Sequence, residues 1–187
     1  ASEGALVALS DVPEGVRDVL RRRLARLPEA AVSILRLASV VGREADVEVL
    51  TDAAEVDPDT VFDALEQGVA AGFLDEPSVG TVRFAHAIVR DTLYSDLTRL
   101  RRSRWHTRIG EALERLRPHD YAALAHHFAE ALSTTTARRA VGYNLAAADQ
   151  AVSRYAHDVA IGFLRNAEAA AKVLPADDRA DAEEWVD

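Results

Sequence analysis

The stretch DPDTVFDALEQGVAAGFLDEPSVGTVRF, residues 57–84, decides the fold. In its first half apolar residues recur at helical spacing, after an N-capping Asp57 and a proline suited to the first helical turn. After Gly72 the period changes, and two short strand-like runs bracket the turn cluster PSVG at 77–80. The pattern predicts a helix over residues 58–71 followed by a small β-hairpin.

Apolar periodicity predicts further helices on both sides of this stretch. Before it they cover residues 13–27, 28–41 and 46–54; after it they cover residues 87–98, 100–116, 121–132, 136–152 and 156–173. The helix at 28–41 has little polar surface and is expected to be central, ending at Gly42 as a C-cap. Four helices followed by a hairpin are the layout of a winged helix-turn-helix domain.

The predicted organisation is mainly α, with three segments. Residues 1–11 form a weakly patterned entry segment, residues 12–117 a winged-helix domain, and residues 118–187 the start of a helical repeat domain, with Pro118 at the boundary. In the last segment, small residues at facing positions suit helix pairs that stack closely, as in helical repeats. A further helix is predicted to begin near Pro175 and to be cut off by the chain end, so we expect a piece of a longer protein.

Composition limits the classes of protein to which this chain can belong. Hydrophobic residues make up 49% of the 187 residues, enough for a core, and alanine and leucine outnumber β-branched and aromatic residues, which favours packed helices. The chain has no cysteine, hence no disulfide and no thiolate zinc site. It has neither an apolar run of transmembrane length nor a secretion signal at its start, so we expect a cytoplasmic protein without a membrane partner.

Charge argues against DNA as a partner of the predicted winged helix. The net charge is −9, and from Glu55 to Glu76 the would-be recognition helix and its flanks carry seven acidic residues and no basic one. The turn at 77–80 offers no arginine for a minor groove. Because readers of the major groove need basic groups toward the phosphates, a DNA-binding domain is the disfavoured alternative.

Several segments, in this order along the chain, resemble STAND-class signalling ATPases. They are VPEGVRDVLRRRLARLPEAAVSILRLASVVG (12–42), RFAHAIVRDTLYSDL (83–97), RRSRWHTRIGEALERL (101–116), LAHHFAEA (124–131) and SRYAHDVAIGFLRNAEAAAKVLP (153–175). The first four look like the winged-helix segment and its continuation in bacterial large ATP-binding regulators of the LuxR type and their MalT-like and AfsR-like relatives. The fifth is similar to the second half of a tetratricopeptide-type repeat.

The resemblance implies a regulatory role. In that family an upstream ATPase core binds nucleotide, the winged helix holds the ADP form shut, helical repeats sense an inducer or protein partner, and a separate effector delivers the output. This chain has no G-x-x-x-x-G-K-[ST] phosphate loop, and its only lysine is Lys172. We therefore expect no enzyme in this chain and no cofactor of its own. ADP and ATP would bind the nucleotide-binding core of the parent protein, which would oligomerise on activation.

His86 is the leading candidate for a functional residue. It stands where the hairpin leads into the next helix, a place that favours anions. The resemblance gives a histidine in the Phe84-x-His86 position a nucleotide-sensing role, near the β-phosphate of ADP. The alternatives are a histidine that caps its own helix or one buried in the core. Arg90, one turn later, would either support this site or form a surface ion pair.

The other candidate sites are weaker. Five arginines without an intervening acid form either a phosphate or partner patch or a solvated helix face: Arg99, Arg101, Arg102, Arg104 and Arg108. Metal binding is not expected of His126 and His127 with His119, because adjacent helical residues point about 100° apart. His106 and His157 are expected to be structural. The sequence has no G-x-S-x-G motif and no identifiable pair of carboxylates that would predict catalysis. A purely structural connector is the alternative to a regulatory segment.

Overall fold

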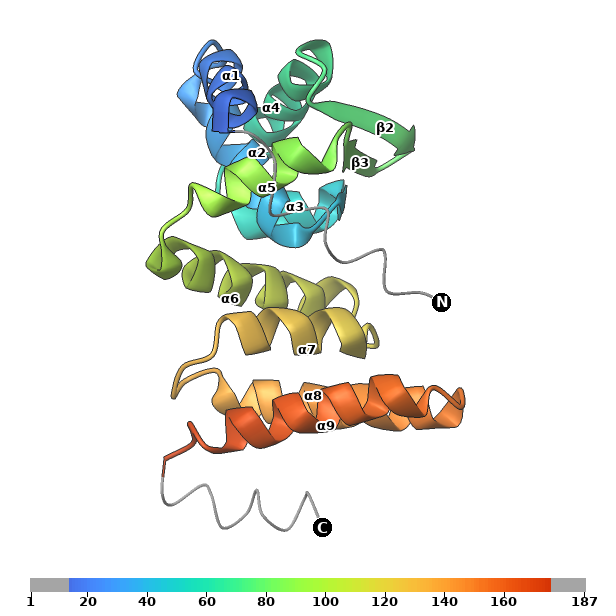
Figure 1. Cartoon of the computed structure of the whole chain (residues 1–187). Helices are drawn as coiled ribbons and strands as arrows, with labels where there is room; N and C mark the ends of the chain where they lie inside the picture. The colour runs from blue at the N-terminus through green and yellow to red at the C-terminus, as the bar shows by residue number, and fades with distance from the viewer. Residues whose placement is uncertain (1–13, 176–187) are drawn as a thin grey trace, which may run out of the picture. The chain divides into compact units, whose positions relative to one another are not determined.

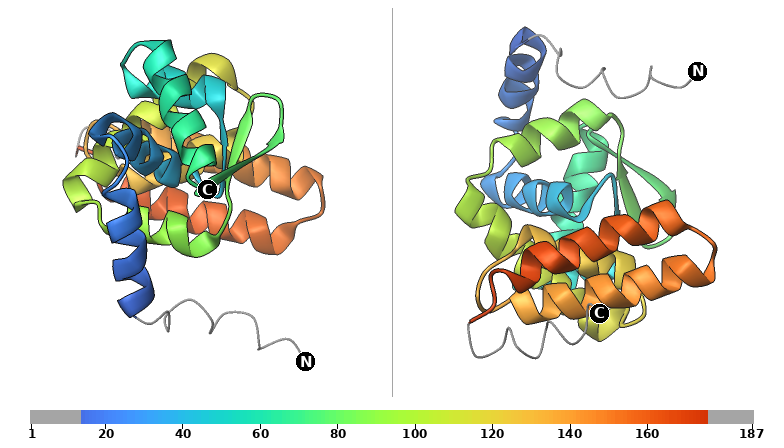
Figure 2. Two further views of the ribbon diagram at one scale, coloured as in Figure 1. Left: turned by 90° about the horizontal axis from the view of Figure 1, so that it is seen from above. Right: turned by 60° about the horizontal axis from the view of Figure 1, so that its bottom comes forward.

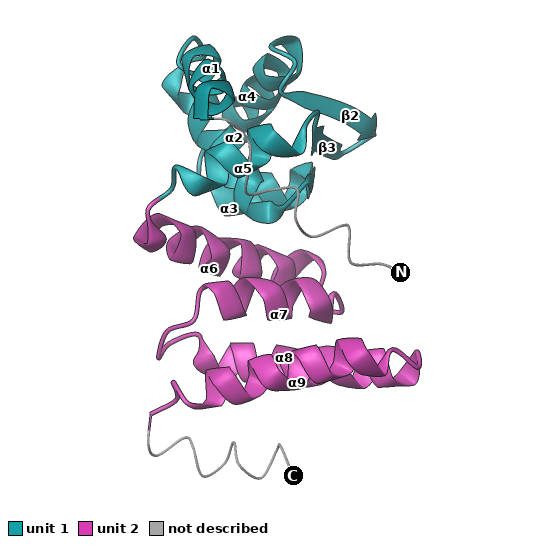
Figure 3. Ribbon diagram, in the orientation of Figure 1, with its two compact units in different colours: residues 1–97 teal, residues 98–187 magenta. Residues whose placement is uncertain are grey.

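A computed structural model of the chain describes residues 14–175 (Figure 1). The predicted entry segment, 1–11, and the helix predicted to begin near Pro175 lie outside these residues, apart from Pro175 itself. The chain divides into two compact units, residues 1–97 and residues 98–187 (Figure 3). The described part is mainly helical with one small antiparallel sheet, which confirms the mainly α prediction. None of its helices is both long and apolar enough to cross a lipid bilayer.

Unit 1 contains five helices and three strands within the described residues. They are α1 (Glu14–Leu24), α2 (Glu29–Val41), β1 (Glu44–Asp46), α3 (Val47–Ala54), α4 (Pro58–Ala70), β2 (Leu74–Ser78), β3 (Thr81–Phe84) and α5 (Ala87–Ser95). Both neighbours of β3 are antiparallel to it, in the order β1-β3-β2. The hairpin of β2 and β3 was predicted; β1 was not, because its three residues, Glu44–Asp46, are too few and too polar to show alternation.

Helix α2 is the centre of unit 1, as predicted. Its side chains are buried on several sides: Leu35, Ala38 and Val40 are each 0% exposed. The helix packs against α4 and α5, and its end is marked by Gly42, whose N–H donates to the carbonyl of Ala38. An all-round apolar helix is stable only where neighbours cover every face, which explains the central position.

The two ends of α4 confirm the signals in the deciding stretch. At the start, the Asp57 carboxylate accepts a hydrogen bond from the Asp59 N–H, and a proline follows at the first helical position. At the end, Gly72 adopts φ +70°, and the N–H of Phe73 reaches back to the carbonyl of Gly68. This is a Schellman cap, which favours glycine at the left-handed position and turns the chain into β2.

The hairpin is short and closed by two residues. Ser78 pairs with Thr81, so Val79 and Gly80 form the loop, and Gly80 takes the positive φ of +77°. Strand β3 alternates buried and half-buried residues, with Val82 and Phe84 facing the core. A register irregularity in β2 between Asp75 and Ser78 contains Pro77, which a sheet edge tolerates because no inner ladder bond is lost.

Up to residue 175, where the described part ends, unit 2 consists of two helical hairpins. Its helices are α6 (Arg99–Leu116), α7 (Tyr121–Glu130), α8 (Ala137–Ser153) and α9 (His157–Ala171). Each helix packs on the next, and α8 and α9 lie side by side along their length (Figure 2). A seam of small residues, Ala148, Ala151 and Ala160, allows this close approach, with Phe163 packed against it.

Along the chain, the boundary between the two compact units follows Leu97, earlier than the predicted domain boundary after Arg117. The difference concerns α6, which the sequence grouped with the winged helix. Within unit 2, α6 packs closely on α7: a Cβ built on Gly110 would lie 2.8 Å from Cζ of Phe128. The backbone of α6 thus lies against an aromatic ring of α7, and this tertiary contact has no signature in the periodicity of either helix.

Candidate functional site

His86 occupies the N-cap position of α5, directly after β3. Its side chain is exposed and makes no capping hydrogen bond, while its carbonyl accepts the first helical bond, from the Val89 N–H. Neither of the structural alternatives, a side-chain cap or a core histidine, therefore holds. His86 thus stands at the first turn of α5, where free amide groups and the helix dipole favour negative charge.

Arg90 has a structural role within unit 1. Its Nε donates to the carbonyl of Ser39 at 2.9 Å, one of the last-turn carbonyls of α2 that lack a helical partner. Its guanidinium also pairs with Asp91 at 3.2 Å and stacks over Tyr94, 4.9 Å from the ring centroid. The surface ion pair expected as an alternative is present, and the contact with Ser39 ties α5 to α2.

The exposed face of α4 is acidic, as the sequence predicted for this helix. Asp59, Asp63 and Glu66 are exposed, and Phe62 stands among them with 51% of its surface accessible. Opposite them, Val61, Ala64 and Leu65 are buried against the rest of unit 1. A helix with this outer face repels phosphates and suits a basic or apolar protein surface.

The five arginines of α6 do not form one uniform patch. Arg102 and Arg108 are half-buried and engaged within the protein, and Arg101 lies over the Trp105 ring at 5.7 Å. Arg99 and Arg104 are exposed. The run occupies the first half of α6, whose first turn holds no acid, so these cations meet the positive end of the helix dipole. The exposed members remain a predicted surface for an anionic partner.

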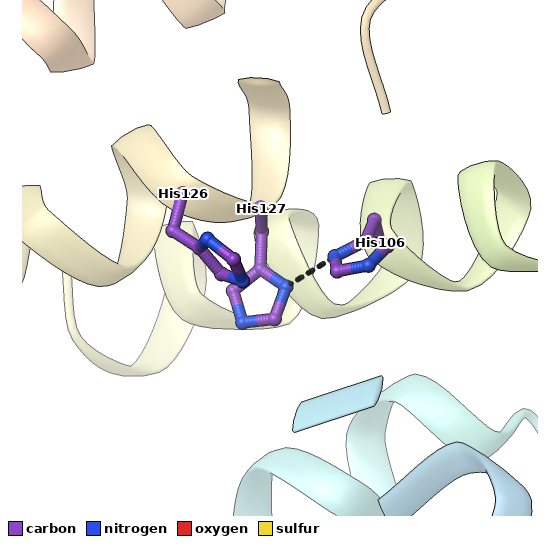
Figure 4. A group of neighbouring side chains, drawn as sticks. All are labelled: His106, His126 and His127. Atoms are coloured by element: carbon purple, nitrogen blue, oxygen red, sulfur yellow. Dashed lines mark hydrogen bonds between the residues drawn. The ribbon is translucent and has the colours of Figure 1, made fainter. Parts of the chain in front are cut away.

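Three histidines of unit 2 come together from two helices: the neighbours His126 and His127, and His106 from a different helix (Figure 4). His106 projects from α6, and His126 and His127 project from α7. One ring nitrogen of each lies within 4.8 Å of one ring nitrogen of the other two. The ring centroids are 5.1 Å apart for His106 and His127 and 5.6 Å apart for His106 and His126.

Two of these rings form a buried hydrogen bond. His106 and His127 are only 1% and 3% exposed, and their Nδ1 atoms are 2.9 Å apart. One ring donates from Nδ1 and the other accepts there, so the two rings cannot both be charged. Burial, with the nearby His106 and His126, lowers the pKa of His127 to about 2, which keeps its ring neutral at neutral pH.

Sequence reasoning missed this cluster for a geometric reason. Adjacent histidines do point about 100° apart on a helix, but both can still reach a third ring that approaches from a neighbouring helix. The premise used against a shared site for His126 and His127 therefore fails. His119, the third histidine weighed there, instead lies near Tyr121, its Nδ1 3.4 Å from the hydroxyl, and His157 is exposed at the start of α9.

A pocket lies beside the cluster within unit 2. Its volume is about 340 Å³, and it is lined by the end of α7 and the middle of α9, including His126, Glu130, Phe163 and Asn166. His126 belongs both to this lining and to the histidine cluster. The exposed His126 thus links the histidine cluster to the pocket.

Comparison with known proteins adds no relative. A scan against protein-family models and searches of curated proteins and of solved structures matched nothing.

Proposed function

We propose that this chain is a non-catalytic regulatory segment of a nucleotide-switched signalling ATPase, a cytoplasmic bacterial transcriptional regulator of the LuxR type. Unit 1 would be its winged-helix domain, which holds the ADP-bound off state against the nucleotide-binding core. Unit 2 would begin the tetratricopeptide-like array that senses an inducer or protein partner. These two functions would be coupled because the contacts of the segment differ between the off state and the active state of the parent protein, and not through a chemical reaction.

The order of elements in unit 1 supports this proposal most. A helix, a short strand, two helices and a hairpin follow one another from α2 to β3, and the third strand pairs between the other two. This is the arrangement expected of a winged helix-turn-helix, with α4 in the place of the recognition helix and the loop of β2 and β3 in the place of the wing.

The location and freedom of His86 support a sensing role. An exposed imidazole at the first turn of α5, with no capping bond to its own helix, is available to a phosphate group that approaches the same amides. Arg90, engaged with Ser39, would hold α5 on α2 and so position His86 rather than contact nucleotide itself.

The main alternative, a DNA-binding winged helix, has the wrong charge. The outward residues of α4 include Asp59, Asp63 and Glu66, and no basic residue lies on that helix. Binding of duplex DNA gains most of its affinity from cations placed at phosphates. A gel shift of this chain with random duplex at low salt should therefore show no complex, and a salt-sensitive complex would favour the alternative.

The decisive experiment uses the full-length parent protein. Fluorescent-nucleotide titration of the wild type and His86→Ala should show weaker ADP binding in the variant, by about 10-fold for the loss of one charge-assisted hydrogen bond, with ATP binding unchanged. His157→Ala is the matched control, because His157 is also an exposed histidine at a helix start, in unit 2. Equal ADP affinity in all three proteins would leave unit 1 as a structural connector.

A further inference from the structure

We propose that His106, His126 and His127 form a binding site for a divalent transition-metal cation of the zinc class. The proposal rests on unit 2 alone and does not depend on the role assigned to unit 1. Among residues 14–175 these three are the one group of histidine and carboxylate side chains whose ligand atoms come close enough together to hold an ion.

The distances fit a site that needs only a small adjustment. Nitrogen ligands at about 2.0–2.1 Å from a tetrahedral ion lie roughly 3.3 Å from each other. The Nδ1 atoms of His106 and His127 are 2.9 Å apart, so this pair must open slightly. The third nitrogen lies within 4.8 Å of the others, and the exposed ring of His126 is free to supply most of the movement.

The type of ligand selects the type of metal. Three imidazoles without a carboxylate or thiolate suit Zn²⁺, Cu²⁺ or Ni²⁺, whereas Mg²⁺ and Ca²⁺ prefer oxygen ligands. Two of the rings are fixed by packing, since His106 and His127 are almost fully buried on facing helices. Ligands held in place by the fold lose little conformational freedom on binding, which raises affinity.

The pocket provides a route of entry and an open coordination position. His126 lines it, so a hydrated cation can meet this ring first and then the buried pair. With three protein ligands, the fourth tetrahedral position is left for water or for a donor atom of a small molecule in the pocket. Glu130 and Asn166 line the same pocket and offer hydrogen-bond partners to that fourth ligand.

Binding of the cation requires one proton of the histidine pair to change its position. In the hydrogen bond one ring carries its proton on Nδ1 and the other ring accepts there. To bind a cation through both Nδ1 atoms, the donor ring moves its proton to Nε2. Both rings stay neutral, and the cation replaces the shared proton as the link between α6 and α7.

The test is titration of the tag-free, chelator-treated chain with Zn²⁺ by isothermal calorimetry. We expect one ion per chain, with a dissociation constant in the micromolar range or below. His126→Ala is the first variant, because this side chain is exposed and its loss leaves the core intact. It should weaken binding by at least about 100-fold, since even changes one shell further out cost 10–100-fold.

His119→Ala is the matched control, an exposed histidine just before α7 that lies outside the cluster. It should bind Zn²⁺ like the wild type. The visible spectrum of the Co²⁺ form should show intense four-coordinate bands in the wild type and the control but not in His126→Ala. Absence of stoichiometric binding, an unchanged affinity in His126→Ala, or an equal loss in His119→Ala would overturn the proposal and leave the cluster as a structural hydrogen bond.

Discussion

The two units differ in how they treat buried polar groups. In unit 1 the buried Ser39 and Thr92 donate to carbonyls of their own helices, those of Arg36 and Ile88, at 2.7 Å. In unit 2 the buried Asn144 and Thr136 also donate to nearby carbonyls, but the buried His106 and His127 are partners of each other across two helices. Local bonds of the first kind survive small shifts between helices, whereas the second kind requires α6 and α7 to hold their positions. The buried polar contact that depends on the relative positions of two helices therefore lies in unit 2.

The largest expected effect tests whether the units have separate cores. Leu35 is fully buried in α2, so Leu35→Ala should lower the stability of unit 1 by about 2–5 kcal/mol through lost burial and a cavity. Amide hydrogen exchange should become faster throughout unit 1 while the slowest amides of unit 2 keep their protection. Phe62→Ala, at a site 51% exposed, is the control and should change little.

Substitutions at two glycines test the close packing of helices in unit 2. Gly110→Ala would place a Cβ 2.8 Å from the Phe128 ring and should destabilise unit 2 by about 1–3 kcal/mol. Gly142→Ala, in α8, meets nothing within 4 Å and should instead stabilise the unit by about 0.5–1 kcal/mol. Urea unfolding followed by tryptophan fluorescence, to which the buried Trp105 of α6 contributes, measures both, and equal effects would contradict the contact between α6 and α7.

A further effect concerns pH. The pKa of His127 is lowered from 6.5 to about 2 by burial first and then by the two neighbouring histidines. Between these values the unfolded chain binds a proton that the folded chain does not, so stability is full above pH 6.5 and falls as the pH falls. The loss from this residue should be about 1.4 kcal/mol at pH 5.5.

Urea unfolding of chelator-treated protein at pH 7.5 and pH 5.5 measures this loss. His127→Leu removes the titrating ring and should reduce the difference between the two pH values, whatever its effect on overall stability. An undiminished difference in that variant would assign the acid sensitivity to another group.

The sequence predicted most of the local structure, because its signals are local. The N-cap at Asp57 and the left-handed Gly72 bound α4 where expected, and the hairpin follows. Strand β1 escaped prediction since it is defined by its pairing, Glu44 opposite Arg83, and not by its own composition. The end of unit 1 at Leu97 likewise depends on which helices pack together, which periodicity does not report.

The histidine cluster could be predicted only in part. His106 lies three residues before the buried Ile109, and His127 lies three residues after the buried Leu124, so both stand on apolar helix faces. That spacing indicates burial, and a buried histidine needs a partner. The identity of the partner depends on the contact between α6 and α7, which no spacing within one helix reveals.

We propose above that unit 1 senses the nucleotide state of a parent ATPase. The most direct measurement is amide hydrogen exchange over residues 85–90, the start of α5, in the full-length parent loaded with ADP or with a non-hydrolysable ATP analogue. We expect slower exchange of these amides with ADP than with the ATP analogue. Equal exchange in the two nucleotide states would contradict it.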